Sequence, residues 1–466
     1  MSPLRQPELL AARRILARLA DEGHTAYLAG GAVRDLLLGR TPTDCDIATS
    51  ARPAQVLALF VRTFAVGAHF GVVLVVEDVE GREIVTEVAT FRNDGAYSDG
   101  RHPDAVSYSS SPAEDVARRD FTINGLLLDL LKLPAQSKVS VEELRSATLD
   151  FCGGLADLDA TILRAIGDPR RRFDEDKLRM MRAIRFAARL GYQIEPVTFA
   201  VICELAPTIE VVSQERVRDE LTRMLTEGRA RRAFELLDAS GLLKAVLPEV
   251  ARLKGVEQPP QFHPEGDVWQ HTLLLLDQLE RDCPPTLAWG ALLHDAGKPA
   301  TFRRAEDRIR FDGHVEIGVK IAEEITRRLR FSGEESAQIA ALVANHMRFS
   351  DVHRMKQSTL KRFFRMNNFE EHLALHRMDC MASHGHLDNW EFAREHYTTL
   401  PPEEIRPTLL VDGRVLIAVG YKPGPGFSRM LQAAEDAQLE GLISTAEQGL
   451  SLIRERFGPP TVSSLN

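Results

Sequence analysis

The spacing of apolar residues changes near residue 140, and this change limits the folds that the chain can adopt. Before it, strand patterns alternate with helical ones, with a strand at 25–29, a helix from residue 31 and strand-rich runs at 71–77 and 83–91. After it, apolar residues recur almost wholly at helical spacing. The pattern predicts an α/β or α+β head that is followed by an all-helical body.

Glycines and prolines divide the helical part further. They interrupt the helical pattern at 254–267 and again at 420–426. A chain of 466 residues is also longer than one hydrophobic core usually serves. We predict four parts: a head at 1–140, a helical neck and body at 141–252, a third domain at 253–400 and a C-terminal helical segment at 401–466, to which the sequence assigns no role.

The composition disfavours some classes of protein. No run of about 18 apolar residues is present to cross a membrane, and the five cysteines lack the paired spacing of zinc or redox sites. We therefore expect a cytoplasmic protein. Its net charge is −9, yet residues 164–189 hold nine basic and four acidic side chains, a local charge of +5. A local basic surface of this kind can bind RNA although the whole chain is acidic.

Two neighbouring glycines, Gly30 and Gly31, follow the first predicted strand and open a helix. Glycines let backbone N–H groups approach a phosphate, and the start of a helix adds positive charge. Arg34 lies one helical turn further on and can bind the same anion. The segment therefore indicates a phosphate site, with a tight structural corner as the alternative.

Asp44 and Asp46 follow on a predicted strand, where residues i and i+2 point to one face. Converging carboxylates are suited to Mg²⁺, and such a pair can hold two ions for in-line displacement on a triphosphate. Glu87, in a later strand-rich run, is a candidate third catalytic carboxylate. The alternation along its strand also fits a residue that faces solvent.

Two segments of the head, LAGGAVRDLLLGRTPTDCDIA and RRDFTINGLLLD, resemble the class II tRNA nucleotidyltransferases and the related bacterial poly(A) polymerases. The resemblance implies an α+β fold with a polymerase-β-type head, a mixed sheet with helices, on an all-α neck and body. It implies that Asp44 and Asp46 are the catalytic Mg²⁺ ligands. It also assigns ribose and triphosphate recognition to four residues whose alternative role is a buried ion-pair network: Arg118, Arg119, Asp120 and Asn124.

The segment FDEDKLRMMRAIRFAARLG has helical spacing, and on one helix Asp176 and Arg179 are neighbours at i and i+3. The resemblance assigns this pair to the base edge of the incoming CTP or ATP, whereas a surface salt bridge is the alternative. Three further arginines fall within a narrow arc of the same helix. They are expected to contact tRNA phosphates, unless they form an ordinary solvated face: Arg182, Arg185 and Arg189.

The segment TFRNDGAYSDGRHPDAVSY at 90–108 resembles the flexible loop of enzymes that add the complete CCA. The basic segment typical of the poly(A) polymerases is not found after the aspartates. The resemblance therefore implies template-independent addition of CCA to the 3′ end of tRNA, with CTP and ATP as substrates. Addition of A alone, of CC alone or of poly(A) remains possible from the sequence, which also does not indicate an oligomeric state.

His271, the adjacent His294 and Asp295, and Asp379 match the order of the HD superfamily of metal phosphohydrolases. Imidazole and carboxylate ligands suit a transition metal or Mg²⁺. Two histidines between these positions, His314 and His346, are candidate further ligands. We expect an all-α HD domain with phosphohydrolase activity and a divalent metal, and the sequence does not choose the metal or decide between one ion and two.

A different class of function is also conceivable for a chain of this organisation. In it, the HD domain is the enzyme and the head is only an RNA-binding module. The simultaneous presence of the acidic pair and of Asp120, Asp176 and Arg179 disfavours this hypothesis, because a decayed transferase site would be expected to lose metal ligands.

Overall fold

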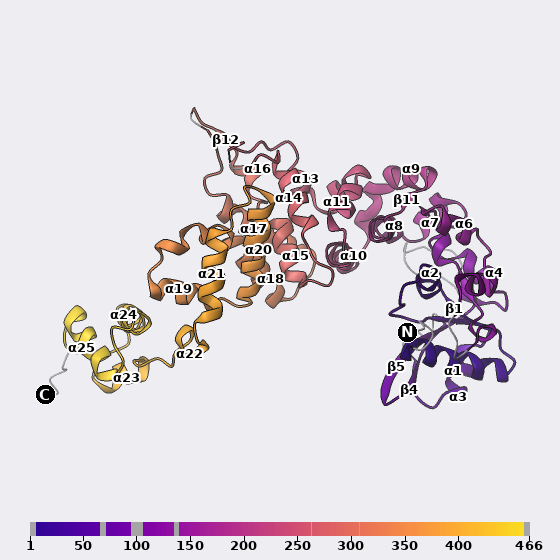
Figure 1. Cartoon of the computed structure of the whole chain (residues 1–466), viewed down its shortest axis with the longest axis horizontal. Helices are drawn as coiled ribbons and strands as arrows, with labels where there is room; N and C mark the ends of the chain where they lie inside the picture. Colours follow the sequence, from indigo (N-terminus) through magenta and orange to yellow (C-terminus); the bar gives the residue numbers. More distant parts are fainter. Residues whose placement is uncertain are drawn as a thin grey trace. The chain divides into compact units, whose positions relative to one another are not determined.

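The computed structural model describes residues 6–65, 71–94, 106–134, 139–261, 263–306 and 308–460. The chain divides into two compact units, Met1–Ala251 and Arg252–Asn466, which Figure 1 colours from indigo to magenta and from magenta to yellow. Within the described ranges, no helix is long and apolar enough to span a membrane.

A mixed seven-stranded sheet forms the centre of the head, with the strand order β3-β4-β5-β2-β1-β8-β9. β2 and β5 run parallel, and the other neighbours run antiparallel. Its strands are β1 (Ala26–Ala29), β2 (Ile47–Thr49), β3 (Thr63–Phe64), β4 (Val72–Val79), β5 (Arg82–Thr90), β8 (Leu127–Leu128) and β9 (Thr148–Leu149). A separate pair joins β6 (Arg92–Asp94) to β7 (Val106–Tyr108). The α+β head is thus confirmed.

Helix α1 (Pro7–Asp21) shows how the sequence builds this core. Its apolar residues recur at helical spacing, and Leu9, Ile15 and Leu19 are buried where the helix packs on β4 and β5. Each such side chain contributes about 1.5–3 kcal/mol by leaving water. The other helices and 3₁₀ turns of the head are α2 (Gly31–Leu37), α3 (Pro53–Leu59), α4 (Pro112–Ala117), η3 (Thr122–Asn124), η4 (Leu130–Lys132), α5 (Val141–Ser146) and α6 (Gly154–Asp159).

The remainder of the first unit is helical apart from the short parallel pair β10 (Ile162–Leu163) and β11 (Gln193–Ile194). Helix α8 packs against both α10 and α11, so two of its sides are covered. The helices are α7 (Pro169–Glu175), α8 (Leu178–Leu190), α9 (Pro196–Leu205), η5 (Ala206–Val211), α10 (Gln214–Thr226), α11 (Ala230–Ala239), α12 (Leu242–Val246) and α13 (Pro248–Ala251).

The prediction that Asp176 lies on one continuous helix with Arg179 is wrong. Helix α7 ends at Glu175, and the backbone of Asp176 is extended, with φ −149° and ψ 105°. The Asp176 carboxylate accepts a hydrogen bond from the backbone N–H of Leu178 at 3.0 Å. Aspartate side chains compete in this way for backbone donors, which favours helix ends over helix interiors. Asp176 therefore lies at the junction between α7 and α8.

The second unit is helical apart from the hairpin of β12 (Arg303–Arg304) and β13 (Ile309–Arg310). Its core holds Trp289, Phe349, Phe363 and Phe369, all fully buried. The helices are α14 (Val268–Asp277), α15 (Pro285–Leu293), α16 (Lys298–Thr301), α17 (His314–Arg328), α18 (Gly333–Asn345), η6 (His346–Arg354), α19 (Gln357–Phe364), α20 (Phe369–Ala382), α21 (Asp388–Thr399), α22 (Pro402–Ile405), α23 (Gly413–Ala418), α24 (Phe427–Leu439) and α25 (Ala446–Phe457).

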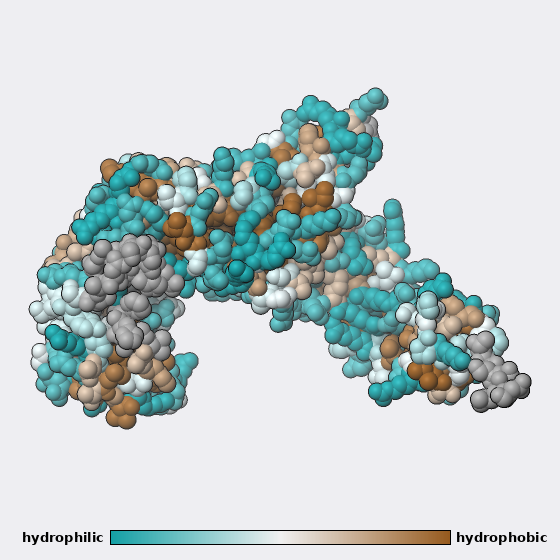
Figure 2. Space-filling view, turned by 180° about the vertical axis from the view of Figure 1, so that it is seen from behind, coloured by the Kyte–Doolittle hydropathy of each residue, from teal (hydrophilic) through white to brown (hydrophobic). Residues whose placement is uncertain are grey.

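The C-terminal segment packs its last three helices around a small core of its own, which includes Leu416 and Ile453. Ion pairs connect α24 to α19, where Arg362 and Arg365 contact Glu435 at 2.7 and 2.5 Å. On the face in Figure 2, hydrophilic side chains predominate and hydrophobic ones form several separate groups.

Candidate functional site

The glycine turn of the head lies against an arginine. Gly30 has φ +69°, a conformation that favours glycine, and its N–H donates to the carbonyl of Leu126 at 3.0 Å. A Cβ atom on Gly30 would lie 3.2 Å from Arg119 Nη1, and one on Gly31 would lie 3.6 Å from Arg34 Nη2. Two guanidinium groups thus flank the start of α2, and they supply the positive charge that favours a bound phosphate.

Three carboxylates emerge on one face beside this turn. Asp44 and Asp46 immediately precede β2, and both are exposed whereas the intervening Cys45 is buried. The Asp46 carbonyl accepts from the N–H of Ala29 at 2.9 Å, so the extended backbone continues past the strand end. Ile47 lies opposite Val88 in the parallel register, which places Asp46 next to Glu87. The prediction that the aspartates lie on the strand is wrong, since Asp44 and Asp46 precede it by three residues and one, but the alternation of exposure is present.

The electrostatics of Asp46 follow from this crowding. Although the residue as a whole is exposed, the surrounding chain reduces the hydration of its carboxyl group, and the negative charges of Glu87 and Asp44 add to this effect. Together they raise the pKa of Asp46 to about 6, against the opposing influence of Arg119. Carboxylates that raise one another's pKa are stabilised by a nearby cation.

The residues predicted to bind ribose and triphosphate form an ion-pair network. Arg118 and Arg119 both contact the buried Asp115, at 2.6 and 3.0 Å. Asp115 was missed by the sequence analysis, although it precedes the arginines by three and four residues on helical spacing. The network leaves Arg119 between Asp115, the glycine turn and the charge of Asp46. A fixed guanidinium at this place is suited to orient a triphosphate.

Asp120 and Asn124 form a second chain of polar contacts. Arg182 on α8 donates to Asp120 at 2.7 Å, and Asn124 donates to the same carboxylate at 3.3 Å. The side-chain amide oxygen of Asn124 in turn accepts from Arg34 at 2.7 Å. Arg34, only 2% exposed, also contacts Asp35 at 2.8 Å. Arg182 is thus an internal link between α8 and the glycine turn.

The side chains of the two residues predicted to read the base do not contact each other, although the Arg179 backbone N–H donates to the Asp176 carbonyl at 3.0 Å. Arg216 on α10 binds the Asp176 carboxylate with two hydrogen bonds, at 2.8 and 3.2 Å. Arg179 instead contacts Glu175 at 2.7 Å and the carbonyl of Arg118 at 3.2 Å. The surface salt bridge considered from the sequence is therefore absent. Arg216 was missed, because a contact between two helices leaves no local pattern.

The prediction of an outward-facing arginine arc is wrong for Arg185. Its side chain is buried and contacts Glu220 at 2.7 Å and Glu227 at 3.2 Å, on and just after α10. Arg189 contacts Glu227 at 3.4 Å and Asp35 at 4.0 Å, with its side chain 24% exposed. Since α10 covers this side of α8, the arc faces protein more than solvent.

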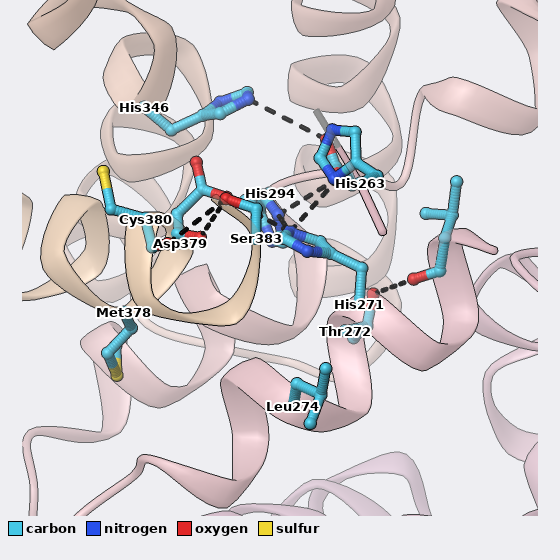
Figure 3. Close-up of polar contacts among 12 residues, drawn as sticks. His263, His271, Thr272, Leu274, His294, His346, Met378, Asp379, Cys380 and Ser383 are labelled. Carbon is cyan, nitrogen blue, oxygen red and sulfur yellow. Dashed lines mark hydrogen bonds and ion pairs between the residues drawn. The ribbon is translucent and has the colours of Figure 1, made fainter. Parts of the chain in front are cut away.

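In the second unit, four side chains of the HD pattern meet at one point. His271 lies on α14, His294 and Asp295 follow α15, and Asp379 lies on α20. Figure 3 shows His271, His294 and Asp379 directed toward one another. His271 Nε2 lies 3.3 Å from His294 Nε2 and 3.1 Å from an Asp379 oxygen. These three residues form one group whose ligand atoms are within 4.8 Å of one another.

His314 and His346 complete a second group with Asp295. Their Nε2 atoms lie 4.0 and 3.9 Å from the same Asp295 oxygen, and both are buried without a hydrogen-bond partner among the described residues. The Nδ1 atom of each lies within hydrogen-bonding distance of a backbone carbonyl, at 2.9 and 2.7 Å, which directs Nε2 inward. The six side chains that the sequence proposed for this centre are thus brought together.

Burial and charge act in opposite directions on these imidazoles. Burial acts to lower the pKa of His271, but hydrogen bonds to Asp379 and Glu265 outweigh it and raise the pKa to about 9. Burial and the charge of His294 lower the pKa of His346 to about 4. Lys298 contacts Asp295 at 2.7 Å, and its positive charge offsets part of the negative charge of the carboxylate. Glu265 and Lys298 were not singled out from the sequence.

Three comparisons with known proteins agree with this arrangement. Residues 26–164 match the poly(A) polymerase head domain, residues 191–254 match the probable RNA- and SrmB-binding site of polymerase A, and residues 267–378 match the HD domain. The CCA-adding enzyme of Geobacillus stearothermophilus is 40% identical over 246 residues, which cover 53% of this chain and 56% of the relative.

Similarity also extends over the full length. A crystal structure of the Bacillus stearothermophilus CCA-adding enzyme in complex with CTP matches with a TM-score of 0.72 and 26% identity, over 97% of this chain and 98% of that one. The CCA-adding enzyme of Leuconostoc mesenteroides is 30% identical over 462 residues, 98% of each chain. Because this similarity runs through both units, the chain belongs to the family of CCA-adding enzymes, which are tRNA nucleotidyltransferases.

Proposed function

We propose that this protein adds the CCA sequence to the 3′ end of tRNA without a nucleic-acid template, with CTP and ATP as substrates. The observation that carries the proposal is the face formed by Asp44, Asp46 and Glu87 next to the glycine turn and Arg119. It lies in a chain whose full length resembles CCA-adding enzymes. Because the proposed substrate is tRNA, the proposed function also supports a cytoplasmic location.

Asp44 and Asp46, with Glu87 as a third carboxylate, would hold divalent cations, and the all-oxygen ligand set favours Mg²⁺. The fit is supported by the raised pKa of Asp46, since a cation relieves the repulsion that causes it. A pair of Mg²⁺ ions held there would supply positive charge to the triphosphate and to the attacking 3′-hydroxyl. The 3′-oxygen would bond to the α-phosphorus, the bond from the α-phosphorus to the bridging oxygen would break to release pyrophosphate, and the hydroxyl proton would pass to water.

The chain's own residues orient the nucleotide. We assign the triphosphate and ribose to the turn at Gly30 and Gly31 and to Arg34, Arg118, Arg119, Asp120 and Asn124, which converge around it. Arg34 and Asp120 contribute through their hydrogen bonds to the Asn124 side chain. Arg189, at the partly exposed end of α8, and Arg182 remain candidates for tRNA phosphates. The four-part division at 140, 252 and 400 likewise remains a proposal.

Asp176 and Arg179 would select the base, because cytosine and adenine each present an amino donor beside a ring-nitrogen acceptor. Arg179→Ala is expected to reduce the preference for CTP and ATP over UTP and GTP about tenfold to a hundredfold, the worth of one charged hydrogen bond. The measurement is single-nucleotide incorporation with each of the four triphosphates. Equal loss with all four, or weakened tRNA binding, would contradict the assignment.

The raised pKa of Asp46 gives a pH dependence with a defined sign. We expect the affinity for Mn²⁺, used as a probe for Mg²⁺, to fall as the pH drops through about 6, because protonation removes a ligand charge. The metal-free head should gain stability as the pH falls from about 6 toward the ordinary aspartate value of 3.8. Glu87→Gln should move the midpoint to lower pH. Mn²⁺ titrations over this range, in both proteins, test the expectation, and an unchanged midpoint would contradict it.

The experiment that tests the function is incorporation of labelled CTP and ATP, singly and together, on tRNA transcripts that end before CCA, after C and after CC. Extension of all three to a finished CCA is expected. Extension of the last transcript alone by a single A would make this an A-adding enzyme, products that end in CC would make it a CC-adding enzyme, and long A tails would make it a poly(A) polymerase. The loop at 90–108 bears on this choice, but residues 95–105 lie outside the described ranges.

We propose a second activity, hydrolysis of phosphate esters at the HD centre. His271, His294 and Asp379 would hold one divalent ion, and Asp295, His314 and His346 a second. The two buried Nε2 atoms without hydrogen-bond partners among the described residues support this fit, because buried polar atoms otherwise cost free energy. The mixed imidazole and carboxylate donors suit several transition metals, and the bound ion would supply Lewis acidity to a phosphate.

Asp295→Ala is expected to abolish hydrolysis of a 2′,3′-cyclic phosphate on RNA ends, because Asp295 contacts both ligand groups. CTP incorporation should remain, since the carboxylates of the head are untouched. Assays of both activities on one preparation test this. Undiminished hydrolysis would remove Asp295 from the mechanism, and hydrolysis without CTP incorporation in the unsubstituted protein would favour a hydrolase whose head only binds RNA.

A further inference from the structure

The short segment in front of α14 carries two side chains that are not ligands in the proposed metal centre. Gly266 has φ +125°, where glycine is favoured, and it turns the chain between Glu265 and Asp267. Asp267 fixes the turn at both sides, since it accepts from the N–H of Gln270 at 2.8 Å and from that of Gly255 at 2.6 Å. The turn places Glu265 beside His271, one turn into the helix.

One oxygen of Glu265 serves two imidazoles. Oε1 lies 2.8 Å from His271 Nδ1 and 2.8 Å from His263 Nδ1. The Glu265 and His271 side chains are 7% and 0% exposed, whereas that of His263 is 18% exposed. An ionised carboxylate oxygen only accepts, so both Nδ1 atoms must carry hydrogen. In the neutral imidazole, Nε2 is then the atom without hydrogen, and it lies 3.3 Å from His294 Nε2 and 3.1 Å from an Asp379 oxygen, where a cation can bind.

This arrangement differs from that of the other imidazoles at the centre. The Nδ1 atoms of His294, His314 and His346 lie against backbone carbonyls, at 2.9, 2.9 and 2.7 Å. A carboxylate carries a full negative charge and therefore strengthens the imidazole as an electron-pair donor more than a neutral carbonyl does. The second Glu265 oxygen, Oε2, is buried and has no hydrogen-bond partner within the described residues. A buried charge that is half satisfied is costly unless positive charge lies nearby.

We propose that Glu265 is a positioning residue that holds His271 as a metal ligand, and that His263 holds Glu265 in place. The inference rests on the proposed metal centre at His271, His294 and Asp379. The hydrogen bond to Glu265 fixes the tautomer and ring orientation of His271. A cation bound at Nε2 would in turn compensate the negative charge of Glu265 through the imidazole ring. Loss of such an outer partner typically weakens metal binding about tenfold to a hundredfold.

The test measures Ni²⁺ binding calorimetrically in the full chain, since Ni²⁺ accepts imidazole ligands readily. Asp379→Ala, which removes a proposed ligand of the same ion as His271, identifies the heat that belongs to this site. Glu265→Gln keeps the shape but not the charge, and is expected to weaken Ni²⁺ binding about tenfold to a hundredfold. His263→Ala should weaken it less, and His263→Gln, which retains an N–H donor, should restore part of the loss. The matched control is His386→Ala, which removes an exposed imidazole.

A second readout separates positioning from folding. In Zn²⁺-loaded protein with ¹⁵N-labelled histidine, His271 should show Nδ1–H and a metal-bound Nε2, and Glu265→Gln should shift its Nδ1 resonance. A lower melting temperature of the metal-free variant with unchanged Ni²⁺ affinity would overturn the inference. If the unsubstituted protein binds no Ni²⁺ at this centre, the metal centre itself fails. Unaltered CTP incorporation in each variant verifies that the first unit is folded, and unaltered tryptophan fluorescence verifies the same for the second unit.

Discussion

Asp46→Ala is expected to lower CTP incorporation at least about a thousandfold, which corresponds to about 4 kcal/mol of lost transition-state stabilisation. The reason is geometric: Asp46 stands between Asp44 and Glu87, so its loss removes the central ligand of the proposed Mg²⁺ site. Asp44→Ala should have a similar effect. The measurement is the single-turnover rate of CTP addition at saturating tRNA.

The control for this prediction is Glu83→Ala, on the same strand as Glu87. Glu83 is 63% exposed and only pairs with Arg62 at the surface, so its loss should change the rate little. The chain's three tryptophans, Trp269, Trp289 and Trp390, all lie in the second unit. Their fluorescence should be identical in the variants, and a rate of Asp46→Ala close to that of Glu83→Ala would remove Asp46 from the chemistry.

Arg185→Ala is expected to destabilise the first unit by about 3–5 kcal/mol, because it leaves Glu220 buried without its partner. The Arg185 and Glu220 side chains are 4% and 6% exposed, so water cannot replace the lost contact. The measurement is urea unfolding followed by far-ultraviolet circular dichroism, which reports both units. Tryptophan fluorescence reports the second unit alone and should keep its midpoint.

Two variants make this prediction specific. Arg189→Ala removes a more exposed and longer contact, and should cost less than about 1 kcal/mol. Arg185→Met combined with Glu220→Leu replaces the pair with apolar groups and should recover most of the stability. If Arg185→Ala weakened tRNA binding without changing the unfolding midpoint, Arg185 would be a phosphate contact, as the sequence pattern suggested.

Local patterns predicted the residues whose placement depends on near neighbours. Alternation along a strand placed Asp44 and Asp46 on one face, and that holds although the strand begins one residue later. The parallel pairing that brings in Glu87 is a tertiary feature, so the sequence offered it only as a candidate. The order of histidines and aspartates along the chain indicated the HD centre. In the structure, each of these residues lies on a helix or at a helix end.

Predictions failed where a second helix decides the environment. Periodicity placed Arg185 on an arc opposite the apolar residues of α8, but it could not show that α10 covers that arc. For the same reason Arg216 was missed, because its partner Asp176 lies on another segment. Glu265 was missed because its contact with His271 depends on the turn at Gly266. The interruption at Asp176 arises from its own side chain, which binds a backbone N–H beyond the junction.

The polar chain from Arg182 through Asp120 and Asn124 to Arg34 has an evolutionary consequence. It connects the helix assigned to the base with the turn assigned to the triphosphate, and each member satisfies the next. A substitution at one member therefore changes two tasks at once, and a compensating change must come from the adjoining member. We therefore expect homologues that add different nucleotides to differ first at exposed positions. The four linked residues should change together and not one at a time.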